Sequence, residues 1–537
     1  MSRTLKPTRA YKRCNPQMCG IIGIFKHEGS VNVELYEGLL MLQHRGQDSA
    51  GMVTTDWNKF KEYKENGLVK DVFANENLMA SMKGNCGIAH VRYPTAGSSS
   101  ASEAQPFFVN SPLGIYLIHN GNLTNTDELR DVLNCSRSFF NSDSELLLNV
   151  LADEGAYSCL CLVKGVGMVA FRDPYGIRPL MLGRRVTPLG EEWCVASEDC
   201  AFGPIGFERV RDVNPGEMVV VGQDGRLHCR QLAAPHLTPC IFEYIYLARP
   251  DSVLNKIPVY NFQLGLGSRL ARHIRERQWE LDLVCPVPDG SRPSAIQIAA
   301  DLGLPYREGL VKNRYVGRTF IMPNQRLREM SVRRKLNAMP TVFEGKRVLL
   351  VDDSIVRGGE GLVKNRYVGR TFIMPNQRLR EMSVRRKLNA MPTVFEGKRV
   401  LLVDDSIVRG TTMSQIVNMV RNAGAAKVYL ASSAPPVRYP NVYGVDMPNR
   451  KEFVAHELSE EQICEVLGAD GLIYQRVEDL IEVGSEMNPD IHEFDDSCFT
   501  GKYCTSQAAS LIGQAMPSGS NGGSNNTFRV DKEPAAV

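Results

Sequence analysis

The sequence predicts a mixed α/β protein with two domains, because the pattern of its apolar segments changes once along the chain. From Cys19 to about Ile241, short apolar runs alternate with glycine-rich turns, which is typical of a strand-rich, layered domain. From about Phe262, apolar strands alternate with helices, which is typical of a parallel sheet covered on both faces. A length of 537 residues is enough for two or more domains that each bury a core.

In the N-terminal half, strands are expected where an apolar run is bounded by glycine or other turn residues. Helices are expected at Val33–Gln43 and Ser142–Asp153. Cys159 and Cys161 share one face of an expected strand, which favours core packing over metal ligation. The expected strands are Gly20–Phe25, Gly87–His90, Ile115–His119, Ala156–Val163 and Met168–Phe171.

In the C-terminal half, the expected helix Thr412–Ala423 places its apolar residues on one face and is stopped by Gly424. A tail that begins at about Ser506 is rich in serine, glycine and asparagine, so we expect it to be disordered. The other expected helices are Phe262–Gln278 and Pro293–Leu302, and the expected strands are Leu283–Val287, Lys398–Val403 and Lys427–Ser432.

The composition excludes several classes of protein. A net charge of +3 is too small at this length to indicate nucleic-acid or membrane binding. No apolar run approaches the length of a membrane-spanning helix, which predicts a soluble protein. The 14 cysteines are irregularly spaced and form no Cys-x-x-Cys pair, which favours reduced thiols and a cytoplasmic location.

Residues 1–18 are basic and contain no acidic residue. A transit peptide has this composition, but the segment lacks the apolar stretch of a secretory signal. We favour a propeptide, or a start site placed too far upstream. The basic residues are Arg3, Lys6, Arg9, Lys12 and Arg13.

A block of the sequence is repeated without a single change: Glu308–Gly358 recurs as Glu360–Gly410. Solenoid repeats diverge at their surfaces, so an unchanged copy does not indicate a repeat fold. It indicates a recent tandem duplication or an error in assembling the coding sequence.

The second copy ends in an apolar strand, two acids and a small-residue loop, and a helix follows it. Backbone N–H groups at a helix start, together with nearby hydroxyls, form a cradle for a phosphate dianion. Asp404 and Asp405 would repel that phosphate, so we expect them to face ribose hydroxyls, with Mg²⁺ nearby.

This arrangement resembles the signature of the type I phosphoribosyltransferases, which bind 5-phosphoribosyl-1-pyrophosphate (PRPP). The resemblance implies that Asp404 and Asp405 bind the ribose and hold Mg²⁺. It also implies that the 5′-phosphate is bound by Ser406, Ile407, Val408, Arg409, Gly410, Thr411 and Thr412.

The first copy lacks this cradle, because Gly359 and Glu360 replace the two threonines that follow the second copy. The carboxylate of Glu360 would repel a phosphate. We therefore expect only one copy of the strand in the sheet, Val400–Asp405. Its duplicate, Val348–Asp353, is expected to be extruded with the surplus chain, since loop-closure cost grows slowly with length.

Two further segments are expected to contact the same substrate. The turn Cys285–Ser291 suits a pyrophosphate, and the resemblance implies that Ser291 helps to hold Mg²⁺; a plain loop capped by Ser291 is the alternative. A segment with cations, aromatics and a glycine occurs at Lys312–Pro323 and again at Lys364–Pro375, which predicts a lid from either copy. The lid residues of the second copy are Lys364, Tyr367 and Arg370.

Cys19 comes immediately before an apolar strand, and a lone cysteine there is usually part of a core. Three more motifs change this interpretation: His44–Asp48, His90–Gly97 and His119–Asn122. Together they resemble the class II glutamine amidotransferases, in which the catalytic cysteine is the mature N-terminal residue. A free α-amine can then act as the base for its own thiol.

The same resemblance implies an N-terminal αββα domain of the Ntn-hydrolase class. It implies that Arg92 binds the carboxylate of glutamine and that Asp143 binds its amine. Asn120 and Gly121 are expected to form the oxyanion hole. Since residues 1–18 precede Cys19, activity requires processing after Met18 or initiation there.

Together, the two halves resemble the glutamine phosphoribosylpyrophosphate amidotransferase family. This implies that PRPP, glutamine and water become 5-phosphoribosylamine, glutamate and pyrophosphate, the first committed step of purine synthesis. It also implies Mg²⁺, a homo-oligomer and inhibition by purine nucleotides. The expected divisions are an extension (1–18), a glutaminase domain (19–250), a phosphoribosyltransferase domain (251–505) and the tail (506–537).

Some members of this family carry an iron–sulfur cluster, which we do not expect here. Cys498 has Asp495 where the partner of a Cys-x-x-Cys would stand, and Asn441 replaces another ligand. The family also has more chain after Glu154, so the glutaminase domain is shortened near Asp143.

Two rival interpretations remain at this point. An aminosugar-forming amidotransferase would share the N-terminal motifs, but the PRPP-type loop argues against it. A non-catalytic or misfolded variant is the other rival, because the duplication and the deletion both affect functional domains.

Overall fold

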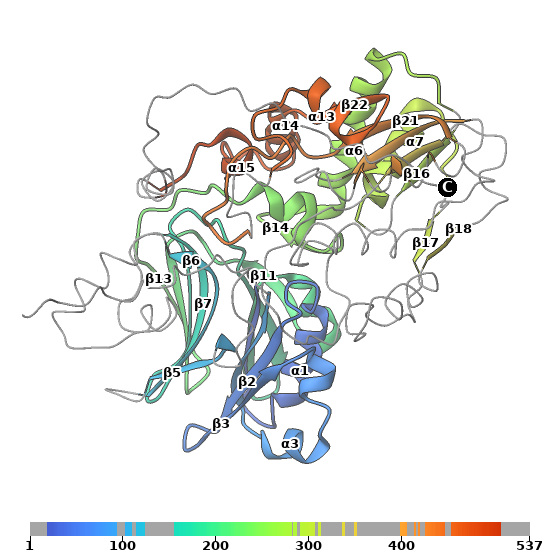
Figure 1. Cartoon of the computed structure of the whole chain (residues 1–537). Coiled ribbons are helices and arrows are strands. Elements are labelled where there is room, and N and C mark those ends of the chain that lie inside the picture. The colour runs from blue at the N-terminus through green and yellow to red at the C-terminus, as the bar shows by residue number, and fades with distance from the viewer. Residues whose placement is uncertain are drawn as a thin grey trace, which may run out of the picture.

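The protein consists of two lobes that lie one above the other in Figure 1. The N-terminal lobe, coloured blue to green, contains two antiparallel sheets, and the C-terminal lobe contains a parallel sheet with helices. The computed structural model describes residues 19–93, 103–109, 114–123, 155–281, 283–286, 290–306, 310–312, 336–338, 348–351, 398–404, 413–414, 417–418, 421, 425–445, 453–505 and 508.

A seven-stranded sheet forms the half of the N-terminal lobe that holds Cys19. β1 (Cys19–Phe25) lies near its centre and every residue of the strand is buried. Such a continuous apolar run suits a strand that is covered on both faces. The other strands, in spatial order with β1 between β10 and β4, are β11 (Glu208–Asp212), β9 (Met181–Thr187), β10 (Gly190–Ala196), β4 (Cys86–Arg92), β2 (Ser49–Thr55) and β3 (Phe60–Asn66).

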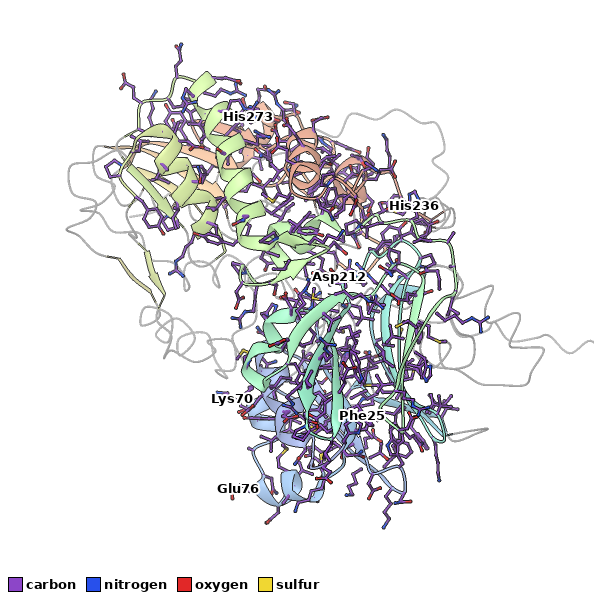
Figure 2. All side chains as sticks on the ribbon, turned by 180° about the vertical axis from the view of Figure 1, so that it is seen from behind. Phe25, Lys70, Glu76, Asp212, His236 and His273 are labelled. Atoms are coloured by element: carbon purple, nitrogen blue, oxygen red, sulfur yellow. The ribbon has the colours of Figure 1, made fainter. Side chains whose placement is uncertain are left out.

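A six-stranded antiparallel sheet faces the first sheet. Side chains from both sheets form the core between them, with Ile21 and Phe25 on one side and Leu160 and Met168 on the other. Phe25 is labelled within this lobe in Figure 2. The strands, in spatial order, are β13 (Leu227–Gln231), β12 (Glu217–Gly222), β8 (Gly167–Arg172), β7 (Gly155–Val163), β6 (Ile115–Leu123) and β5 (Phe107–Val109).

Helix α1 (Asn32–Met41) packs on the outer face of the seven-stranded sheet. Its close approach requires Gly38, where an added Cβ would lie 2.3 Å from Cδ1 of Ile22. Shorter helices complete this side: α2 (Val69–Val72), α3 (Glu76–Ser81), η2 (Asp199–Ala201) and η3 (Gly203–Ile205).

The outer face of the six-stranded sheet has a small apolar cluster of its own. Cys159 and Cys161 are buried there with Tyr157 and Phe171, so the prediction of core packing is confirmed. The helix expected at Ser142–Asp153 lies outside the described residues.

The two lobes share a continuous apolar core. Phe242 stacks on Phe499 with a centroid separation of 5.3 Å, and Tyr244 contacts Phe262 at 5.2 Å. The chain passes between the lobes through a π-helical turn, η4 (Glu243–Leu247), and a short hairpin, β14 (Val253–Leu254) and β15 (Ile257–Pro258).

The longest described helix of the C-terminal lobe buries residues that recur every three or four positions, which is typical of an amphipathic helix. α6 (Val259–Glu276) and α7 (Arg292–Leu302) pack on the parallel sheet, and His273 of α6 is labelled in Figure 2. The remaining helices are α13 (Glu460–Leu467), α14 (Val477–Met487) and α15 (Ser497–Thr500). Among the described residues, no helix is long and apolar enough to cross a membrane.

The parallel sheet of the C-terminal lobe has five strands. Their spatial order is β16 (Leu283–Pro286), β19 (Val348–Val351), β20 (Lys398–Asp404), β21 (Ala425–Ser432) and β22 (Gly471–Tyr474). A separate pair, β17 (Leu310–Lys312) and β18 (Leu336–Ala338), lies at the side of this lobe in Figure 1.

The prediction that only one copy of the duplicated strand enters the sheet is wrong. β19 comes from the first copy and β20 from the second, and they pair side by side. Leu349 lies opposite Leu401, so identical residues of the two copies face each other. The physical reason is that extrusion would expose an all-apolar strand, whereas a parallel sheet pairs both of its edges and buries both of its faces.

Candidate functional site

The candidate nucleophile, Cys19, is held from both sides at the start of β1. Its backbone N–H donates to Oδ1 of Asn120 at 3.1 Å, and its carbonyl oxygen accepts from Nε of Arg45, also at 3.1 Å. Cys19 lies directly opposite Arg92 on the neighbouring strand β4. The structure therefore brings three of the predicted site residues, Cys19, Arg92 and Asn120, to one place.

Asn120 and Gly121 lie on β6, against the nucleophile. The Nδ2 atom of Asn120 is buried and has no hydrogen-bond partner among the described residues. A buried donor without a partner is costly unless a ligand completes it. Gly121 has a φ of +135°, and an added Cβ would lie 2.0 Å from the carbonyl oxygen of Ala156. Only glycine can present its backbone at this position.

Arg92, the predicted ligand for a substrate carboxylate, is completely buried. Its Nη1 donates to Oδ2 of Asp48 at 2.8 Å, and its Nη2 contacts the carboxylate of Glu103. Burial raises the pKa of Asp48, an effect that the charge of Arg92 opposes. Asp143, the predicted partner of the substrate amine, lies outside the described residues.

Behind the nucleophile, Arg45 connects two buried carboxylates that the sequence analysis missed. Its Nη1 donates to Glu198 at 2.5 Å, and its Nη2 donates to Glu243 at 2.8 Å. Burial opposes the ionisation of Glu198, but the charges of His44 and Arg45 outweigh it and hold the pKa of Glu198 well below its usual range. For Glu243 the available signal was an acid inside an apolar run, which is rarely buried unless it is paired. Glu198 is flanked by Ser197 and Asp199 and gave no such signal.

The same carboxylates reach the segment that leads into the second lobe. Glu243 belongs to this segment, and Glu198 accepts from the hydroxyl of Ser252 at 2.7 Å and from the backbone N–H of Arg249 at 3.0 Å. Arg45, which binds the carbonyl oxygen of Cys19, is therefore linked through Glu198 and Glu243 to the segment between the two lobes.

Two residues of the candidate PRPP site are among the described residues, and each follows a strand or ends one. Asp404 is the last residue of β20, and Ser291 is buried at the start of α7, which follows β16. The side chain of Ser291 makes no capping hydrogen bond to the described start of α7. Because β19 lies between them, β16 and β20 are not neighbours.

The rest of this predicted site lies outside the described residues, namely Asp405, Ser406–Thr412 and the lid residues Lys364, Tyr367 and Arg370. The donors assigned to Mg²⁺ are hydroxyl and carboxylate oxygens, which are the ligands that this ion prefers. Among the described residues, no cluster of three or more His, Cys, Asp or Glu side chains suits a metal ion.

The positions compared with an iron–sulfur ligand set lie together in the structure. Nδ2 of Asn441 is 3.5 Å from Oδ2 of Asp495, and Cys498 is buried beside them. Burial, with the charge of Asp495, raises the pKa of the Cys498 thiol.

Comparisons with known proteins agree with this architecture. Residues 90–203 match a family model described as a glutamine amidotransferase domain. The amidophosphoribosyltransferase of Escherichia coli is 47% identical and aligns with 91% of this chain and 93% of its own length. The enzyme of the same name from Saccharomyces cerevisiae is 41% identical, with 91% and 92% covered.

Solved structures extend the similarity to the fold. The chain superposes with a TM-score of 0.72 on a glutamine PRPP amidotransferase from Bacillus subtilis complexed with ADP and GMP. That protein is 35% identical, and the match covers 91% of this chain and 98% of the other. These matches cover both lobes of the structure. The chain therefore belongs to the amidophosphoribosyltransferase family.

Proposed function

We infer that the chain is a glutamine-dependent amidophosphoribosyltransferase. It converts PRPP, glutamine and water into 5-phosphoribosylamine, glutamate and pyrophosphate, the first committed step of purine synthesis. The observation that carries this inference is similarity across both lobes, combined with a cysteine fixed against a buried amide donor that has no partner among the described residues. The rival of a non-catalytic variant is not favoured, because the relatives align along nearly their whole length.

In the first half-reaction, Sγ of Cys19 attacks the side-chain carbonyl carbon of glutamine. The C–N bond breaks, ammonia leaves and a thioester forms, which water then hydrolyses to glutamate. Nδ2 of Asn120 and the N–H of Gly121 stabilise the oxyanion, and removal of residues 1–18 supplies the α-amine that takes the thiol proton. Arg92 and Asp143 orient the carboxylate and the amine of glutamine.

In the second half-reaction, ammonia attacks C1 of the ribose and the bond to pyrophosphate breaks. Asp404 and Asp405 bind the ribose, Ser406–Thr412 bind the 5′-phosphate and Lys364, Tyr367 and Arg370 close over the substrate. Ser291, Asp404 and Asp405 would hold Mg²⁺, which neutralises charge on the leaving pyrophosphate when it is bound. The protein mainly positions ammonia and excludes water.

Several finer properties belong to the same proposal. We propose a cytoplasmic homo-oligomer that binds purine nucleotides as feedback inhibitors. The B. subtilis relative complexed with ADP and GMP supports the last point. We propose that no iron–sulfur cluster is present, since Asp495 and Asn441 occupy positions where ligands would stand.

The test separates the two half-reactions. The chain without residues 1–18 is incubated with PRPP and Mg²⁺, with either glutamine or ammonia as the nitrogen donor, and glutamate and pyrophosphate are measured. We expect glutamate and pyrophosphate with glutamine, and pyrophosphate alone with ammonia. Cys19→Ala should abolish only the glutamine-dependent reaction. Absence of pyrophosphate with both donors would rule out the proposed activity.

A further inference from the structure

We propose that Glu103 is an internal competitor for the substrate: its carboxylate occupies Arg92 until the α-carboxylate of glutamine displaces it. The inference rests on the proposed function, because it takes glutamine as the nitrogen donor. It assigns a role in substrate binding to a residue that none of the sequence motifs identified.

The position of Arg92 makes it the natural anchor for a substrate of Cys19. The two residues are direct partners in the register of β1 and β4, so their Cα atoms are about 4.5–5.5 Å apart. The guanidinium is completely buried, and its Nη1 and Nη2 atoms contact the carboxylates of Asp48 and Glu103. A substrate carboxylate that pairs with Nη1 and Nη2 together therefore competes with these two acids for the same atoms.

Asp48 and Glu103 differ in how easily the carboxylate of each can move away from Arg92. Asp48 is 1% exposed, its backbone N–H donates to the carbonyl of Arg92 at 3.0 Å, and its own carbonyl accepts from Gly67 at 2.8 Å. The side chain of Glu103 is 41% exposed. If Glu103 turns away, water can solvate its carboxylate. Asp48 is buried, so its carboxylate would leave the charge of Arg92 without gaining water.

The net charge around Arg92 favours the exchange of one carboxylate for another over the addition of a third. One guanidinium with two carboxylates already carries a net charge of −1. A third carboxylate in this buried place would repel the other two, while exchange of one carboxylate for another leaves the charge unchanged. The α-carboxylate of glutamine can thus replace that of Glu103 at little electrostatic cost. An amide without an α-carboxylate has no means of displacing it, so Glu103 also contributes to selectivity for an amino acid.

Glutamine can bind only the protein in which Glu103 has left Arg92. The apparent Kd for glutamine is therefore the intrinsic Kd divided by the fraction of protein in this state. In the chain without residues 1–18, Glu103→Gln should therefore lower the KM for glutamine by about threefold to tenfold, with kcat within about twofold. Glu103→Ala is a second variant with the same expected direction, and Glu208→Gln, an exposed acid on β11, is the matched control.

The discriminating substrate is 4-aminobutanamide, which is glutamine without its α-carboxylate. Its kcat/KM should be the same in wild type and Glu103→Gln, and calorimetry should show tighter binding of glutamate to the variant. An unchanged or raised KM for glutamine, or an equal gain for both amides, would overturn the proposal. If the wild-type protein releases no glutamate from glutamine, the proposed function fails instead, and that outcome is recognised before any variant is compared.

Discussion

Leu350 and Leu402 hold the same place in the two copies of the duplicated block, and they lie side by side as partners in the parallel sheet. Leu350 also pairs with Cys285 of β16 on its other side. The first copy therefore stands between the strand that leads to Ser291 and the strand that ends at Asp404.

Removal of residues 308–359 should improve the PRPP half-reaction. One copy of Val-Leu-Leu-Val would then pair with β16 in the register that β19 now uses, and the two strand ends would approach by one strand spacing, about 4.8 Å. Ammonia-dependent release of pyrophosphate should rise by at least about tenfold, since misplacement by 1 Å can cost about 10²-fold.

The control for this deletion is glutamine hydrolysis without PRPP, which should change by less than about twofold, because β1, β4 and β6 lie in the other lobe. Equal PRPP turnover in the full and the shortened chain would contradict the prediction.

The buried amide of Asn120 should be essential for glutamine hydrolysis. Asn120→Ala removes the Nδ2 donor, so kcat should fall by on the order of 10²–10³, the usual cost of losing one oxyanion donor. Ammonia-dependent synthesis should be unaffected. Asn77→Ala, at an exposed position on α3, is the matched control and should retain full activity. A wild-type rate in Asn120→Ala would exclude this residue from the oxyanion hole.

The chain that retains residues 1–18 should hydrolyse no glutamine. In that form the nitrogen of Cys19 is an amide, which cannot accept the thiol proton, and its N–H is already donated to Asn120. After removal of the segment, kcat/KM for glutamine should rise with pH as the α-amine loses its proton near about 7.7–8.0. Wild-type glutaminase activity in the unprocessed chain would show that another group acts as the base.

Glu198→Gln should destabilise the N-terminal lobe, because it leaves Arg45 and His44 without one of their buried partners. The expected loss is about 3–5 kcal/mol at pH 7. Since the folded-state pKa of Glu198 is depressed, its stabilisation is fully present above the ordinary value of about 4.3 and is lost as the pH falls through the folded-state pKa.

Urea unfolding of both proteins between pH 7 and pH 3 measures this effect. The difference in unfolding free energy should be largest at pH 7 and should shrink as the solution becomes acidic. A difference that stays constant over this range would show that the charge of Glu198 contributes nothing.

Local patterns were sufficient for several of the described elements. The expected strand Ile115–His119 is the core of β6, and the expected helix Phe262–Gln278 is α6 with shifted ends. The helix starts earlier because Pro258 precedes it, and it ends earlier because Gln278 has a φ of +53°.

Contacts between distant parts of the chain were not predictable in the same way. Arg45 and Glu243 are 198 positions apart, and only the folded sheet and the passage between the lobes bring them together. Glu103 was missed because its partner lies on another element. The position of the duplicated strand was predicted wrongly: a binding site needs only one such strand, but a parallel sheet can pair both edges of a second one.

The pairing of β19 with β20 shows how this architecture accommodates a coding change of fifty-two residues. Every strand of a parallel sheet presents hydrogen-bonding groups on both edges, so a duplicated segment that contains one whole strand can enter as a complete unit. The lobe has grown by one strand without losing the neighbours on either side. Length variation in such a domain can therefore come in steps of one strand, with the distance between two functional loops as the quantity that changes.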